Sequence, residues 1–128
     1  MNHWLNVVLN QNGIILSYES AIEELEYAQD EVIGKNWFDI FIEPTDKNKI
    51  FKLFMECFYR DNFLDKKPQL HTNDVITKNG HHKLIDFENE MLLSHTGEKF
   101  ILVKGIEHHL HYCKCLSPTP DFLQNFEK

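Results

Sequence analysis

The sequence contains no long hydrophobic run and no basic leader segment. Its first apolar stretch, Trp4 to Leu9, is interrupted by Asn6 and followed by Asn10, which argues against a membrane span or a signal peptide there. Cysteine is scarce too, and three residues, an odd number, do not suggest a framework of disulfides. We therefore expect a cytoplasmic protein with no membrane insertion in this segment.

Positive charge is also in short supply. Thirteen Lys and Arg residues against 20 Asp and Glu residues leave a net charge of −7 at pH 7, so a surface that follows nucleic-acid phosphates is not expected. Catalytic motifs are missing as well: the chain has no nucleophile elbow, glycine-rich phosphate loop, HExxH or paired CxxC. These absences predict no nucleic-acid partner, no enzymatic activity and no catalytic residues.

What the chain does have is an ordinary globular composition with clear local patterns. Its 128 residues, 42% of them hydrophobic, suit one domain. Trp4–Leu9 and Ile14–Leu16 are typical of two strands joined by a turn at Asn10–Gly13. Ser20–Glu23 then fits the capping-box pattern, which predicts that a short helix begins at this serine.

The stretch from Val32 to Phe41 is rich in aromatic side chains. Gly34 can take a positive φ without steric strain, and we expect it to end the preceding helical segment. Asn36 can cap the short helical turn that carries the aromatic residues. An aromatic group of this density belongs to the core or to the wall of a pocket.

The clearest amphipathic helix is predicted from about Asp46 to Tyr59. Its apolar residues recur with the helical period, and lysines and glutamate take the other face. The apolar face consists of Ile50, Leu53, Phe54, Cys57 and Phe58. Tyr59 to Pro68 is polar and mixed, so a loop is expected to follow the helix.

From Leu70 onwards the period is two, which predicts strands at His71–Thr77, Lys83–Ser94 and Phe100–Val103. Asn79-Gly80 is a strong hairpin signal between the first two. The order of elements predicts an α+β domain, a five-stranded antiparallel sheet with short helices and one longer helix on one face. The domain is expected to cover residues 1–108, with residues 109–128 as a C-terminal tail or linker.

Two parts of the sequence resemble a known family. Glu24–Asp39 is similar to the stretch of PAS (sensory box) domains that contains LGY, a pair of acidic residues, IG and a tryptophan. Thr77–Gly80, followed by Ile85–Asn89, resembles the TKDG turn and the next strand of the same family. Together and in order, these motifs resemble a PAS domain across Trp4 to His108. One departure is Glu26, where many members have glycine.

The resemblance implies a sensory, signal-transducing module that binds a small molecule or a protein partner. The resemblance also implies that this module is the input domain of a bacterial-type sensor, with a histidine kinase or diguanylate cyclase as output domain. Members commonly form homodimers, and here we expect pairing through the exposed face of the sheet, with Trp4 and the tail. The family's flavin-binding cysteine is missing from Lys35–Asp39 and its haem-binding histidine from Asp46–Arg60, so no cofactor is expected.

A candidate ligand site follows from the predicted strand Lys83–Ser94. Alternate residues of this strand face the helices, so the amide of Asn89 is directed towards the core. A buried amide must be hydrogen-bonded, either within the protein or to a ligand. An apolar pocket with one or two polar groups is the usual small-molecule site. We expect such a pocket to be bordered by Trp37, Phe41, Phe54, Asn89 and Met91.

Two other functions are compatible with the sequence. A small cone-shaped α+β enzyme or ligand carrier would need a carboxylate or histidine directed into an open cavity. A metal-binding regulator is the other alternative, because His109, His111, Cys113 and Cys115 alternate and are ligand types that suit Zn²⁺. One extended strand spaces alternate side chains about 7 Å apart, too far for a single ion to take all four without a bend. We therefore assign no metal site.

Overall fold

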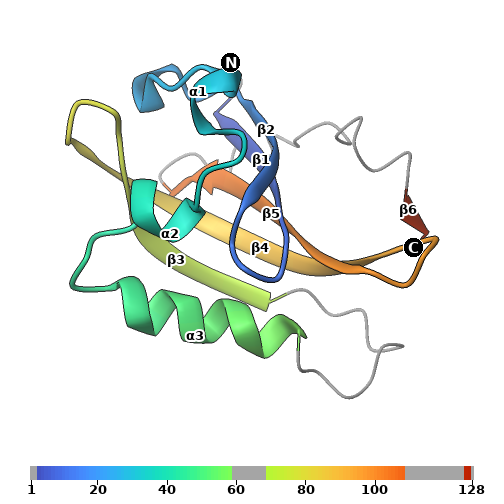
Figure 1. Ribbon diagram of the computed structural model, residues 1–128. Helices are drawn as coiled ribbons and strands as arrows, with labels where there is room; N and C mark the ends of the chain where they lie inside the picture. The colour runs from blue at the N-terminus through green and yellow to red at the C-terminus, as the bar shows by residue number, and fades with distance from the viewer. Residues whose placement is uncertain (1–2, 59–68, 109–125, 128) are drawn as a thin grey trace.

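The computed structural model describes residues 3–58, 69–108 and 126–127 of the 128-residue chain. Five strands form an antiparallel sheet in the order β2-β1-β5-β4-β3, which confirms the predicted fold class (Figure 1). They are β1 (Trp4–Leu9), β2 (Ile15–Ser20), β3 (Gln69–Ile76), β4 (His82–Ser94) and β5 (Lys99–Glu107). A two-residue strand, β6 (Phe126–Glu127), pairs with β4 beyond the end of β3.

The helices lie on one face of the sheet, as the sequence predicts (Figure 1). They are η1 (Glu23–Leu25), a single 3-10 turn, α1 (Gln29–Val32), α2 (Trp37–Ile40) and α3 (Lys47–Phe58). Helix α3 falls within the predicted range Asp46–Tyr59. Tyr59 itself, and the loop expected from there to Pro68, lie outside the described residues.

The first hairpin fixes the position of α2. Gly34 has a φ of 86°, as expected for the residue that ends a helical segment. Asn36 caps α2, because its Oδ1 accepts from the backbone N of Phe38 at 2.8 Å. The Nδ2 of the same side chain donates to Asn12 O, in the hairpin turn, at 3.1 Å. A Cβ added at Gly13 would lie 2.8 Å from the Phe38 ring, so only glycine allows α2 to lie this close to the hairpin.

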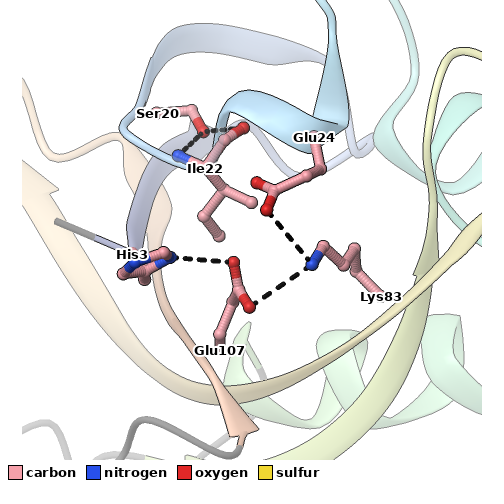
Figure 2. Close-up of polar contacts among 6 residues, drawn as sticks. All are labelled: His3, Ser20, Ile22, Glu24, Lys83 and Glu107. Carbon is pink, nitrogen blue, oxygen red and sulfur yellow. Dashed lines mark hydrogen bonds and ion pairs between the residues drawn. The ribbon is translucent and has the colours of Figure 1, made fainter. Parts of the chain in front are cut away.

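Ser20 does not begin a helix, which contradicts the capping-box prediction. It is the last residue of β2, and its Oγ accepts from the backbone N of Ile22 at 3.0 Å (Figure 2). A serine hydroxyl that bonds the backbone two residues ahead forms a turn in place of a helix cap. The helical turn η1 therefore starts at Glu23 with no side-chain cap.

Glu26 adopts the backbone conformation that explains the glycine found there in PAS domains. It ends η1 with a φ of 64°, a left-handed conformation that is uncommon for residues other than glycine. Its carboxylate accepts from Nδ2 of Asn79 at 2.7 and 2.6 Å. Hydrogen bonds to the β3–β4 turn thus hold a strained residue in place.

The main hydrophobic core lies between the sheet and the helices. Leu5, Val7 and Leu9 of β1 belong to this core. Val8, between them, belongs to a smaller buried cluster on the other face of the sheet, together with Leu92 and Leu102. Strand β1 is therefore buried on both faces. Within the described ranges, no helix is both long enough and apolar enough to span a membrane.

Candidate functional site

A small cavity of about 20 Å³ lies in the main core, bordered by residues of α2, α3 and the sheet. Seven of the ten residues that line it are apolar: Leu9, Trp37, Phe38, Ile50, Phe54, Phe87 and Val103. The other three are His71, Asn73 and Asn89. Of the expected pocket residues, the fold thus places Trp37, Phe54 and Asn89 around one cavity.

Phe41 and Met91, also expected at the pocket, are not among the residues that line this cavity. Phe41 is 0% exposed and stacks behind Trp37, with ring centroids 4.5 Å apart. It therefore supports the wall without forming it. Met91 is partly buried and packs against the same core.

The amide of Asn89 is buried, with the residue 5% exposed, and its orientation is set by a short chain of hydrogen bonds. Its Nδ2 donates to Oε1 of Gln69 at 3.2 Å. Nε2 of Gln69 in turn donates to the backbone oxygen of Leu53, on α3, at 2.8 Å. Oδ1 of Asn89 has no partner among the described residues. One half of the amide is thus hydrogen-bonded within the protein, and the other half is not bonded to any described residue.

His71 and Asn73 on β3 were not predicted as site residues. The His71 ring stacks on Phe87 with centroids 5.4 Å apart. Burial lowers the pKa of His71 below its usual range, and the Asn73 side chain offsets part of that shift. The imidazole is therefore neutral at pH 7. The sequence feature that could have identified these two residues is their spacing: positions 71, 73 and 75 share one face of the strand, and Val75 is a core residue.

A second buried polar group, the Glu107 cluster, comprises His3, Glu24, Lys83 and Glu107 (Figure 2). The Glu107 side chain is 2% exposed, and its carboxylate lies 3.1 Å from Nδ1 of His3 and 3.4 Å from Nζ of Lys83. Lys83 also lies 3.5 Å from the carboxylate of Glu24. The cluster connects the start of β1, the start of β4, the end of β5 and η1.

The described residues offer no group of three or more His, Cys, Asp or Glu side chains that could hold a metal ion. The sequence pattern His109, His111, Cys113 and Cys115 lies outside the residues that the structure describes. A zinc site there stays an untested alternative.

Several solved structures are similar to this chain. The PAS domain of the Cronobacter turicensis RpfR quorum-sensing receptor in complex with BDSF matches with a TM-score of 0.65 at 21% identity, covering 84% of this chain and 96% of that chain. Drosophila melanogaster Cycle PAS-B with bound ethylene glycol matches with a TM-score of 0.67 at 11% identity, covering 80% and 98%. The PAS domain of an HTR-like protein from Haloarcula marismortui gives 0.56 at 16%, covering 81% and 85%.

No family model matches the sequence, and the search of curated proteins found no relative. At identities of 11% to 21%, the similar structures establish the fold and not the ligand. All three are PAS domains, and each is matched over at least 80% of this chain. The strand order, the helices on one face and these similarities together show that the chain has the PAS fold.

Proposed function

We propose that the chain is a sensory PAS module that binds a small molecule in the cavity beside Asn89 and transmits the change to an output domain. The observation that carries this proposal is the buried Oδ1 of Asn89, which lacks a partner among the described residues, on a residue that lines a mostly apolar cavity. Buried polar groups are normally hydrogen-bonded, so this oxygen suits a ligand or an ordered water.

Similar proteins support a small-molecule ligand. The RpfR PAS domain is described in complex with BDSF and with C12:0. In this chain the cavity of about 20 Å³ has room for about one water molecule. A larger ligand therefore requires side chains of α3, such as Ile50 and Phe54, to move away from the sheet.

The proposed module senses and does not catalyse. His71 is the one titratable side chain among the ten residues that line the cavity, and it has no neighbouring carboxylate or thiol there.

We assign residues 1–108 to the module and residues 109–128 to a tail or linker towards a histidine kinase or diguanylate cyclase in the cytoplasm. The boundary near residue 108 is supported by the hydrogen bond from Glu107 N to His3 O at 3.1 Å, because it keeps the end of β5 bonded to the residue before β1.

Replacing Asn89 by leucine tests the proposed ligand contact. Small molecules that raise the melting temperature of the wild type are expected to lose about tenfold in affinity in Asn89→Leu, because one hydrogen bond is removed. The matched control is Asn48→Leu, an exposed position on α3, where the ligand-induced rise should be unchanged. Thermal-shift titrations give both values. A ligand that stabilises Asn89→Leu as well as the wild type would contradict the proposed site.

We also propose that the module forms a homodimer through the outer face of the sheet. Leu70 is 71% exposed and lies on that face of the edge strand β3. Light scattering should give about twice the monomer mass of 15.2 kDa. Leu70→Lys should shift the protein towards monomer, whereas Ile33→Lys, at a site 37% exposed outside the sheet, should not. A wild-type monomer at high protein concentration would refute the dimer.

A further inference from the structure

Oδ1 of Asn89 is a buried polar atom with no hydrogen-bond partner in the described part of the chain, and Asn89 is one of the residues that line the cavity. Two other residues that line it, Asn73 and His71, interact with each other through a side-chain hydrogen bond that raises the pKa of His71. The residues belong to the adjacent strands β3 and β4, where His71 pairs with Phe87 and Asn73 with Ile85. Because native proteins seldom leave buried polar groups unbonded, the unbonded Oδ1 of Asn89 indicates an occupant of the cavity that bonds it.

The hydrogen bonds of the amides determine which atom of Asn89 stays unpaired. The backbone oxygen of Leu53 can only accept, so the atom of Gln69 that faces it at 2.8 Å is the donor Nε2. Gln69 therefore presents Oε1 to Asn89, which must bond it through Nδ2. By the same reasoning, Nδ2 of Asn73 donates to Asp74 O at 2.9 Å. In the amide of Asn89 the unpaired atom is therefore an oxygen, which is an acceptor.

The residues around the cavity carry no positive charge. None of the ten is a lysine or an arginine, and burial keeps His71 neutral at pH 7. A carboxylate beside Oδ1 of Asn89 would meet another acceptor, with no cation to compensate for its lost hydration. An ammonium group would find no carboxylate. The electrostatics therefore favour an uncharged group with a hydrogen to donate.

Building on the function proposed above, we propose that the site selects an uncharged molecule that carries a hydroxyl or amide group and discriminates against the carboxylate of the same length. The donor group enters the cavity of about 20 Å³, which has room for one small polar group, and bonds Oδ1 of Asn89. The apolar part packs on Trp37 and Phe54 after side chains of α3 have moved away from the sheet to make room for it. In the absence of a ligand, an ordered water takes the place of the donor group.

The test is an NMR titration of the full chain with three probes of matched length: butan-1-ol, butyramide and sodium butyrate. The reporter is the indole N–H signal of Trp37, assigned with Trp4→Phe because the chain has two tryptophans. Butan-1-ol and butyramide should shift this signal to saturation, with butyrate at least tenfold weaker. Asn89→Leu should weaken butan-1-ol binding at least fivefold and Asn48→Leu should leave it unchanged. Asn73→Leu serves as the second variant if Asn89→Leu does not fold.

The results of this titration distinguish a wrong ligand class from a wrong proposed function. If butyrate binds as tightly as butan-1-ol, or if the alcohol binds the Asn89 and Asn73 variants as tightly as the wild type, the ligand class is wrong while a ligand site remains. If none of the three probes shifts the Trp37 signal and no small molecule raises the melting temperature, the proposed function fails together with the ligand class.

Discussion

Replacing Lys83 by methionine is expected to lower the free energy of unfolding by about 3 kcal/mol, because it removes the lysine that pairs with a buried carboxylate. The Glu107 side chain is 2% exposed, and Nζ of Lys83 lies 3.4 Å from its Oε2. Breaking a buried ion pair costs about 3–5 kcal/mol, and the lower value applies because the Lys83 side chain is itself 24% exposed. Urea denaturation measures the change.

Three control variants separate the charge effect from lost packing. Lys83→Arg keeps the charge and should retain most of the stability. Glu24→Gln should cost less than about 1 kcal/mol, because the Glu24 side chain is 53% exposed. Adding Glu107→Gln to Lys83→Met should recover part of the loss, since the buried carboxylate charge that the lysine balanced is removed as well. A loss below about 1 kcal/mol for Lys83→Met alone would show that Glu107 does not depend on this lysine.

Replacing Phe41 by alanine is expected to lower the free energy of unfolding by about 3–5 kcal/mol, the usual range for a fully buried aromatic side chain. Phe41 is 0% exposed, and its ring centroid lies 4.5 Å from Trp37, 5.1 Å from Tyr27 and 5.9 Å from Tyr18. The substitution removes the support behind Trp37. The fluorescence of Trp37 should therefore shift to longer wavelength, as expected for an indole that gains access to water.

The matched control for Phe41 is Phe51→Ala, on α3. Phe51 is 36% exposed, so its loss leaves less of a cavity and should cost clearly less than the loss of Phe41. Its ring packs edge-on against Phe38 and is tilted by 37° relative to the ring of Phe54. Equal losses for the two variants would mean that Phe41 is not a central residue of the core.

Local patterns in the sequence were sufficient to predict most of the fold. The cap at Asn36 and the period of α3 depend on nearest neighbours along the chain, and both are confirmed. The inward position of Asn89 follows from the alternation of β4, where Ile85, Phe87 and Asn89 are all buried. Such features need no knowledge of distant contacts.

The polar side of the cavity was harder to predict, because it depends on the length of one turn. Read as a two-residue turn, Asn79-Gly80 would pair Thr72 with Phe87 and direct Thr72 to the core. In the structure, Thr77 pairs with His81 around a three-residue loop that ends at Gly80, with a φ of 86°. This one-residue change of register is what places His71 opposite Phe87.

The Glu107 cluster was not foreseen for a different reason. The predicted strand Phe100–Val103 stopped where Lys104 and Gly105 interrupt the apolar pattern, whereas β5 continues to Glu107. A Cβ at Gly105 would lie 2.8 Å from Ile85 and 3.0 Å from Phe87, so the glycine is required by close packing of side chains from β4. A buried glutamate is recognisable only once the partners that neutralise it, distant in sequence, are known.

The adjacent positions of His3 and Glu107 have a mechanical consequence. Strands β1 and β5 are antiparallel neighbours, paired from Trp4–Ile106 to Leu9–Ile101. A pulling force applied between residues 3 and 108 therefore loads their hydrogen bonds one after another, in unzipping geometry, and not all at once in shear. The bonds of Glu107 to His3 carry the load first, before any contact of the core is strained. Tension applied at these two residues would thus be felt at Glu107 while the cavity beside Asn89 is still intact.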